Sequence, residues 1–149
     1  MARYRFRLQT LRRLREIARD ELRSQLATAY EAERILAEQR AALDAEAAVL
    51  AAGQRQAMQQ SPLDVNRLLE AQRYQLSLQA QSRVLAEQAE KLVTEVQRRR
   101  AAVIEAEREV RVLDKLEARQ RAHHAQGHLQ AETKLLDEMA SVRWKGPRS

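Results

Sequence analysis

The chain has no cysteine and very little glycine, proline or aromatic side chain. Its 149 residues include three glycines, two prolines, one phenylalanine and one tryptophan. Without cysteine, a disulfide framework and thiol chemistry are both excluded. The composition is instead dominated by alanine, leucine, glutamate, glutamine and arginine, and this profile is typical of a coiled coil or a long helix.

Long hydrophobic runs are also missing. No apolar stretch approaches the roughly 20 residues that a membrane-spanning helix needs, and the N-terminus has no hydrophobic segment or cleavage site of a secretory signal. Residues 1–19 are basic and amphipathic, as in a transit peptide, but their leucines stay in phase with the repeats that follow. We therefore interpret them as part of the first helix and expect a cytosolic protein.

Leucine recurs every seven residues along the first third of the chain, and the repeat returns in mirrored order later. The first ladder comprises Leu8, Arg15, Leu22, Ala29, Leu36, Leu43 and Leu50, and the second comprises Leu11, Ala18, Gln25, Ala32, Gln39 and Glu46. Their mirrored partners are, in order, Leu113, Ala106, Arg99, Leu92, Leu85, Leu78 and Ala71, and Val110, Val103, Val96, Ala89, Ser82 and Gln75. Alternating steps of three and four residues are typical of a left-handed coiled coil, and the mirrored order predicts that the chain turns back near residues 60–61.

The predicted fold class is all-α: a long antiparallel two-helix coiled-coil hairpin, with helix 2 longer than helix 1, in a single coiled-coil domain spanning 1–149. We expect helix 1 at about 4–58, the turn at about 59–61, helix 2 at about 62–142 and a tail at 143–149. Ser61 is expected to cap helix 2, with Pro62 at its first position and Asp64 in its first turn. Gly146 and Pro147 are expected to end it.

The unequal helices leave part of helix 2 without a partner. In the mirrored pairing, the start of helix 1 lies opposite about Lys115 of helix 2. Residues 116–142 should therefore project roughly 40 Å beyond helix 1. This segment and its end still carry large apolar side chains, namely Leu129, Leu135, Leu136, Met139, Val142 and Trp144. An apolar helix face with no intramolecular partner predicts an external one.

Positive charge is concentrated at the N-terminus. Residues 1–19 contain seven arginines and one glutamate, which accounts for the whole formal charge of +6 of the chain. Tyr4, Phe6, Leu8 and Leu11 lie between these arginines, and arginine with aromatic residues is typical of binding hot spots. The cluster has three interpretations: a solvated helix end, a phosphate-binding patch, or a docking face for an acidic protein groove.

Individual side chains allow further expectations. We expect Arg12 and Arg19 to reach Glu107 or Asp114 on the other helix, and Arg99 to keep its aliphatic stem in the seam with its guanidinium in water. His124 and His128 share a helix face, but zinc needs a third and fourth ligand. A two-helix hairpin also has no concave pocket. We therefore expect no enzyme, metal, cofactor or small-molecule substrate.

Several ordered segments resemble the FliJ family, the coiled-coil stalk proteins of the bacterial flagellar type III export apparatus. The matching segments are FRLQTLRRLRE at 6–16, NRLL at 66–69 followed by Tyr74 and Leu78, LDKLEARQ at 113–120 and LDEMA at 136–140. The similarity spans essentially the whole chain, and the ordered set of segments carries it, because no single motif is diagnostic.

The resemblance implies a stalk similar to the γ subunit of F-type ATPases, whose end with both termini enters the hexameric flagellar export ATPase and promotes its activity. It further implies contacts with the cytoplasmic domain of the export-gate membrane protein and with export chaperones, in the cytoplasm at the inner face of the cell membrane at the flagellar base. The ring-docking residues would be Arg3, Arg5, Phe6, Leu8, Leu11, Arg12, Arg15, Leu129, Leu136, Met139 and Trp144. The gate-contact residues would be Tyr74, Gln81, Leu78 and Leu85, although the heptads place the two leucines in the seam between the helices.

Other functions remain open from the sequence. The protein could be the equivalent stalk of a virulence type III injectisome. A basic coiled coil could also bind nucleic acid or anionic membrane, but such binding calls for more phosphate-directed charge than one end provides, so nucleic acid is not an expected partner. A hairpin chaperone that grips its clients is the remaining alternative.

Overall fold

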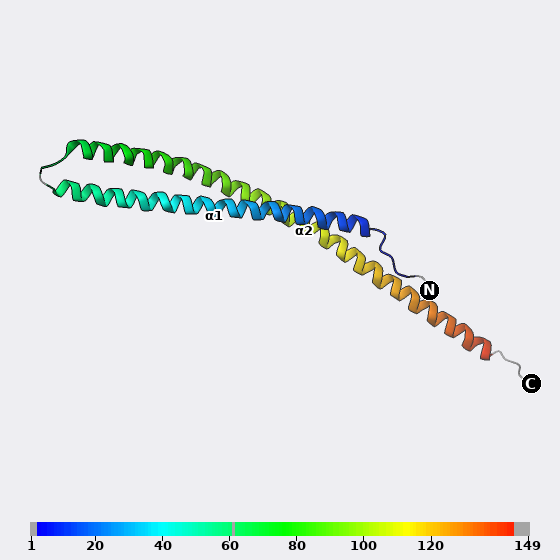
Figure 1. The fold of residues 1–149 in the computed structure, drawn as a ribbon. Coiled ribbons are helices and arrows are strands. Elements are labelled where there is room, and N and C mark those ends of the chain that lie inside the picture. The colour runs from blue at the N-terminus through cyan, green and yellow to red at the C-terminus, as the bar shows by residue number, and fades with distance from the viewer. Residues whose placement is uncertain (1–2, 61, 145–149) are drawn as a thin grey trace, which may run out of the picture. The chain divides into compact units, whose positions relative to one another are not determined.

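A computed structural model describes residues 3–60 and 62–144 of the chain. Its two α-helices are α1 (Gln9–Gln59) and α2 (Val65–Trp144), of 51 and 80 residues, and the described residues contain no strand (Figure 1). The predicted all-α hairpin with a longer second helix is confirmed.

The chain divides into two compact units, and both helices contribute to each. We call residues 21–103 the turn unit, because it contains the connection between the helices. We call residues 1–20 with 104–149 the terminal unit, because it contains both ends of the chain. The single domain expected from the sequence stays a prediction.

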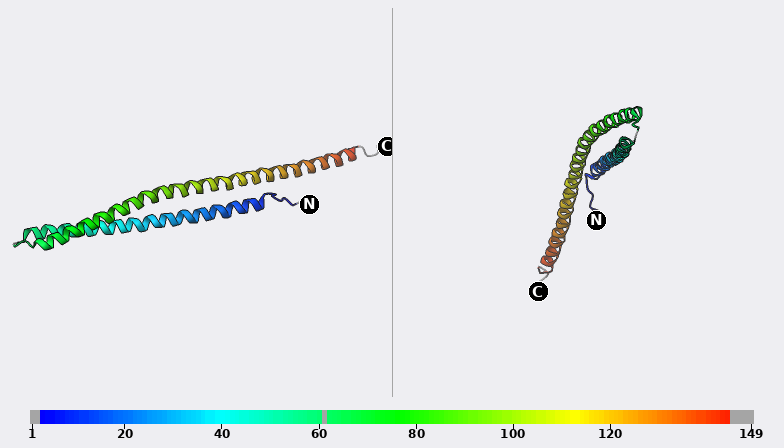
Figure 2. Two further views of the ribbon diagram at one scale, coloured as in Figure 1. Left: turned by 90° about the horizontal axis from the view of Figure 1, so that it is seen from above. Right: turned by 90° about the vertical axis from the view of Figure 1, so that its left-hand side faces the viewer.

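Within the turn unit the two helices lie side by side and run in opposite directions, as Figure 2 shows from two further directions. Ala29 and Leu36 of α1 are buried, as are Leu78, Val96 and Val103 of α2. All five belong to the predicted ladders, which recur every seven residues on one side of each helix. The core is thin, since even its most deeply buried residue among those described, Ala29, keeps 2 % of its surface exposed.

The second ladder of α1 was predicted one residue too early. Gln25, Gln39 and Glu46 are exposed, whereas Leu26 and Glu33 are half-buried. Leu26 lies four residues after Leu22 of the first ladder, and Gln25 lies three residues after it. α1 is rotated so that Leu26 and not Gln25 turns towards α2, because this buries the larger apolar side chain. The α2 ladders, which are apolar at most positions, follow the prediction closely.

Away from the turn, the grooves between the helices are lined by other pairs of residues than the mirrored numbering predicts. Leu36 lines grooves with Leu92, and Leu43 lines a groove with Leu85, whereas the mirrored numbering pairs Leu36 with Leu85. In knobs-into-holes packing each side chain enters a space between successive layers of the other helix. Mirrored numbering therefore locates the residue that faces a given side chain only to within a fraction of the seven-residue repeat.

The turn is longer than predicted, because α2 begins at Val65 and not at Pro62. The Asp64 carboxylate accepts a hydrogen bond from the Arg67 amide at 3.3 Å, and the Asp64 carbonyl accepts one from the Leu68 amide at 3.2 Å. Asp64 is therefore the N-cap of α2 and does not lie in its first turn. The predicted cap, Ser61, lies outside the described residues, as do Gly146 and Pro147.

In the terminal unit, Ala106, Val110 and Leu113 of α2 are buried together with Phe6. The first helix was predicted from about Tyr4, but α1 begins at Gln9 and residues 3–8 are not helical. Their sequence alternates arginine with Tyr4, Phe6 and Leu8, which is the period of an extended chain and not of a helix. We call residues 3–8 the N-terminal strap.

No helix in the described part of the chain combines the length and hydrophobicity that crossing a membrane requires.

Candidate docking site

The N-terminal strap contacts α2 through Tyr4. The Tyr4 hydroxyl donates a hydrogen bond to the backbone carbonyl of Glu117 at 3.1 Å. The Arg121 guanidinium lies 5.3 Å from the centre of the Tyr4 ring, within the range of a cation–π contact, and the His124 ring lies 5.6 Å away. Phe6 is only 6 % exposed. These contacts hold the strap against the segment of α2 that contains residues 117–124.

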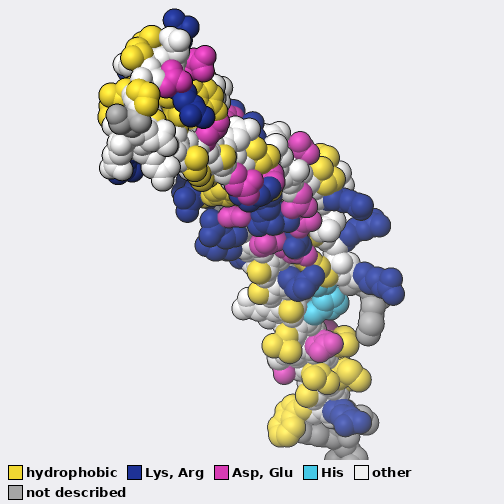
Figure 3. Space-filling view, turned by 60° about the vertical axis from the view of Figure 1, so that its left-hand side comes forward, with side chains coloured by type: hydrophobic (Ala, Val, Ile, Leu, Met, Phe, Trp, Pro, Cys, Tyr) yellow, Lys and Arg dark blue, Asp and Glu magenta, His cyan; other side chains and the backbone are white. Residues whose placement is uncertain are grey.

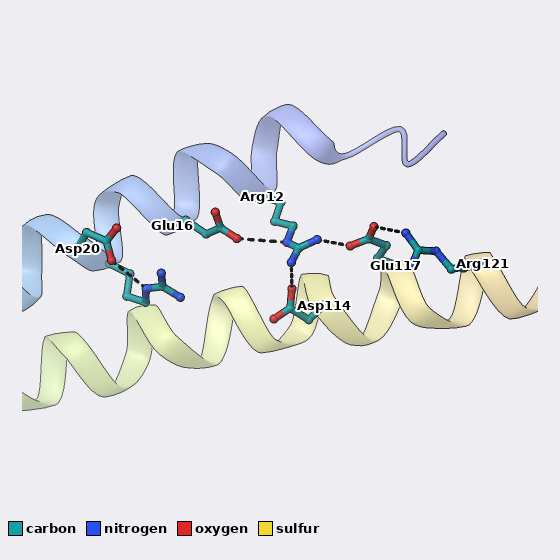
Figure 4. Close-up of polar contacts among 7 residues, drawn as sticks. Arg12, Glu16, Asp20, Asp114, Glu117 and Arg121 are labelled. Atoms are coloured by element: carbon teal, nitrogen blue, oxygen red, sulfur yellow. Dashed lines mark hydrogen bonds and ion pairs between the residues drawn. The ribbon is translucent and has the colours of Figure 1, made fainter. Parts of the chain in front are cut away.

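Arg12 is the centre of the polar contacts in the terminal unit (Figure 4). Its guanidinium forms ion pairs with Asp114 at 2.9 Å, with Glu16 at 3.2 Å and with Glu117. Glu117 also pairs with Arg121 at 3.3 Å. The predicted contact between Arg12 and Asp114 is confirmed. The cluster joins the start of α1 to α2 at the place where the strap is also attached.

The strap presents its arginines on the side away from its buried ring. Arg3, Arg5 and Arg7 are exposed, whereas Tyr4 and Leu8 are half-buried. Over residues 3–6 this division follows the alternation of arginine and aromatic side chains, whereas residues 7 and 8 lie in a turn in which the Gln9 amide donates a hydrogen bond to the Phe6 carbonyl at 3.2 Å. Of the other predicted docking residues, Leu11 is 38 % exposed, and the Arg15 side chain pairs with Glu109 at 3.1 Å. Phe6, which was predicted to face a partner, is buried and offers almost no surface for one.

The last part of α2 is an uncovered apolar surface. Every residue from 125 to 144 is exposed, and the hydrophobic side chains gather along this segment in Figure 3. Leu129 and Leu136 are each 65 % exposed, and Trp144 is 77 % exposed. We call this surface the α2 stripe; it comprises Leu129, Leu135, Leu136, Met139 and Val142, with Trp144 beside it. Such exposure is costly in water, so the stripe is the strongest candidate for a docking surface in the terminal unit.

The second group of predicted site residues lies in the turn unit. Tyr74 is 44 % exposed and Gln81 is exposed, with its amide 3.4 Å from the Ser77 hydroxyl. Leu78 is only 4 % exposed and Leu85 is half-buried. The fold therefore brings Tyr74 and Gln81 to the surface and uses Leu78 in the seam. Leu85 and Gln81 line an open groove with residues of both helices, among them Leu43 and Val84.

Charged side chains in the turn unit form local pairs that support the seam. Arg99 is half-buried, and its guanidinium donates to the Gln25 carbonyl of α1 at 2.6 Å and to the Glu95 carboxylate at 2.8 Å. Arg98 also donates to Glu95, and these two arginines lower the pKa of Glu95 from its ordinary 4.5 to about 2, with Arg98 as the larger cause. The Arg99 guanidinium, expected in water, thus binds a backbone carbonyl across the seam.

His124 and His128 pack edge to face, with ring centres 4.7 Å apart. Across residues 3–60 and 62–144, no group of three or more histidine, aspartate or glutamate side chains is arranged to hold a metal ion. The pair thus extends the aromatic contact that begins at Tyr4.

Sequence reasoning missed the strap and the role of Glu117. The signal for the strap was present, because a strict alternation of arginine and apolar residues over 3–8 cannot place the apolar side chains on one face of a helix. Glu117 gave no comparable signal. It meets Arg12 because the start of α1 lies beside this part of α2.

Comparison with known protein families shows to which family the chain belongs. The model of the family described as "Flagellar FliJ protein" matches residues 4–149. The chain belongs to the FliJ family. No curated protein and no solved structure matches it.

Membership in the FliJ family gives the docking surfaces a biological setting. The protein is a coiled-coil protein related to flagellar protein export, and the family implies interaction with components of the flagellar export apparatus. The FliJ family comprises structural, stalk-type proteins and not known enzymes. The match covers residues 4–8 of the N-terminal strap and the whole α2 stripe, so these candidate docking surfaces lie almost entirely within the matched sequence.

Proposed function

We propose that this FliJ-family protein is a stalk that docks its terminal unit in the hexameric flagellar export ATPase and promotes ATP hydrolysis. The observation that carries the proposal is the uncovered α2 stripe in the same unit as the exposed arginines of the strap. Through its turn unit the protein contacts the cytoplasmic domain of the export-gate membrane protein, and it also binds export chaperones. It acts in the cytoplasm at the inner face of the cell membrane at the flagellar base.

The chemistry of the terminal unit favours a protein partner over an anionic membrane or nucleic acid. The segment 129–144 carries Glu132, Asp137 and Glu138 against Lys134 and Arg143, so it is not basic. Polyanion binding needs a continuous cationic surface. An apolar helix beside exposed arginines instead fits a protein groove with apolar walls and acidic residues, where arginine and aromatic side chains contribute most of the binding energy.

Hydrolysis by the cognate export ATPase tests the docking. Wild-type protein should stimulate it, and replacement of Leu136 and Met139 by aspartate should reduce the stimulation at least about tenfold, because two charges would enter an apolar contact. Val49→Asp is the matched control, since Val49 is 74 % exposed but lies in the turn unit. Helicity should stay unchanged in all variants. Absence of stimulation by the wild-type protein, or equal loss in the control, would contradict the proposal.

The strap arginines should contribute through charge. Replacement of Arg3, Arg5 and Arg7 by glutamine should weaken ATPase binding and reduce its dependence on salt concentration, because three exposed cations are removed. Binding measured at two or three ionic strengths separates this effect from an apolar one. An unchanged salt dependence would show that the strap does not face the ATPase.

The gate contact rests on Tyr74 and Gln81, the two exposed members of the predicted group. Tyr74→Ala should weaken binding to the cytoplasmic domain of the export gate, while Leu76→Ala should not. Leu76 is 59 % exposed, but it lies two residues away and therefore on a different side of α2. Equal binding by wild type and Tyr74→Ala would remove this face from the proposal.

A further inference from the structure

The α2 stripe does not continue the side of the helix that packs on α1. The seam of α2 passes through Ala106, Val110 and Leu113, and the same alternation of three and four residues leads on to Ala131, Lys134, Glu138 and Ser141. None of these later four is a large apolar residue. The stripe therefore lies on another side of the helix, and a partner can approach it while the N-terminal strap keeps its place.

The midline of the stripe consists of Glu132, Leu136, Met139 and Arg143. Their spacings of four, three and four residues place them in one row along the helix, with Leu129, Leu135 and Val142 at its edges. All four are exposed. Glu132 and Arg143 are separated by roughly 16 Å of helix, and neither has an ion-pair partner among the described residues.

This row is complementary to itself when it is reversed. Its spacing is the same from either end, with an acidic residue at one end and a basic residue at the other. A second copy that runs antiparallel places Glu132 opposite Arg143 of the second copy, and Leu136 opposite Met139 of the second copy. A parallel copy would instead place each charge opposite its like, which costs free energy.

We propose that the free protein forms an antiparallel dimer through the α2 stripe, with a twofold axis between Leu136 and Met139. The second copy supplies both the apolar cover and the opposite charges that this surface lacks. The row spans only roughly 16 Å of helix, which is short for a stable protein interface, so the dimer forms and separates readily. This property suits a surface that must later bind something else.

The dimer also regulates the docking. It covers the same Leu136 and Met139 that are proposed to enter the export ATPase, so dimerisation and docking exclude each other. Free chains are thereby kept from exposing an apolar helix until the ATPase is present, and the dissociation of the dimer sets the concentration at which docking begins. This regulatory step rests on the proposed function, whereas the dimer itself does not.

Sedimentation equilibrium of the full chain, without the ATPase, tests the dimer. We expect a concentration-dependent monomer–dimer equilibrium. Glu132→Arg or Arg143→Glu alone should raise the dissociation constant at least about tenfold, because each replaces two attractions by two repulsions. Asp137→Arg changes the charge equally on the opposite side of the helix and should leave the equilibrium unchanged.

Recombining the charges makes the test specific. An equimolar mixture of the two single variants restores two opposite-charge pairs in a heterodimer, and the double variant restores them in a homodimer, so both should recover wild-type association. A wild-type protein that stays monomeric at all concentrations, or variants that fail to recover, would overturn the inference. ATPase stimulation is measured separately, so failure of the dimer with normal stimulation contradicts only the dimer, and a dimer without stimulation contradicts only the docking.

Discussion

Tyr4 attaches the N-terminal strap in two separable ways, through the hydrogen bond of its hydroxyl to the Glu117 carbonyl and through the contacts of its ring with Arg121 and His124. Tyr4→Phe removes only the first, and Tyr4→Ala removes both. A hydrogen bond contributes about 1 kcal/mol, so Tyr4→Phe should speed tryptic cleavage after Arg5 and Arg7 by about fivefold, and Tyr4→Ala should speed it further. Cleavage after Arg55, in the turn unit, should not change. Equal cleavage rates in all three proteins would show that the strap is held by other contacts.

Glu95 makes the turn unit sensitive to acid. Its pKa is about 2 when the chain is folded, below the ordinary 4.5, because Arg98 and Arg99 stabilise the carboxylate. The folded state therefore gains stability from this group above pH 4.5 and loses the gain as the pH falls from there towards 2. Glu95→Gln should lower the melting temperature at neutral pH, and the difference from the wild type should shrink as the pH falls towards 2, as measured by circular dichroism.

A matched variant separates the Glu95 effect from a general change of charge. Glu90→Gln removes the same charge from a glutamate that has no ion pair with another described residue. Its melting temperature should stay close to that of the wild type across the same pH range. A parallel loss in both variants would indicate that the arginines beside Glu95 are not the cause.

At the scale of the helices, Leu78 and Tyr74 separate folding from binding. Leu78 is 4 % exposed and Tyr74 is 44 % exposed on the same helix. Leu78→Ala should destabilise the turn unit by about 2–4 kcal/mol, because it leaves a cavity in a thin seam. Tyr74→Ala should cost well under that amount. Denaturant unfolding gives both values, and comparable losses would show that Tyr74 is part of the core.

Gly127 weakens α2 just before the stripe. A methyl group added there would meet no other atom within 4 Å, so no packing requires glycine. Gly127→Ala should stabilise this part of the helix by about 0.5–1 kcal/mol, which would appear as slower amide exchange over residues 125–135. Gly53→Ala, which meets the same open space in α1, should slow exchange only around residue 53. Faster exchange at Gly127→Ala would contradict this account.

The buried face of a helix was predictable from the sequence where both of its seven-residue ladders consist of apolar residues. In α2, valine and leucine occupy successive seam positions, so only one face could be buried. In α1 the second face offered Gln25 or Leu26, and the choice depends on how α1 is rotated against α2, which periodicity alone does not determine. The start of α1 differs from the prediction for another reason: the leucines of residues 8–22 fit the heptad, whereas the alternation of arginine and apolar residues before Leu8 does not.

At the scale of the whole molecule, the family and the two-helix fold followed from the order of segments along the chain. The candidate site was only partly predictable. The α2 stripe could be predicted from the difference in length between the two helices, which leaves the end of α2 without a partner helix. Phe6, in contrast, was expected to face a partner and is buried. The contact between Tyr4 and the Glu117 carbonyl depends on the path of the strap, and no repeat in the sequence encodes that path.

The thin seam has a thermodynamic consequence. Among the described residues no side chain is buried completely, so unfolding exposes little new apolar surface to water. Globular proteins gain about 12–15 cal/mol/K of heat capacity per residue on unfolding, and this chain should gain less in scanning calorimetry. Its free energy of unfolding should accordingly depend only weakly on temperature, both on cooling and on heating.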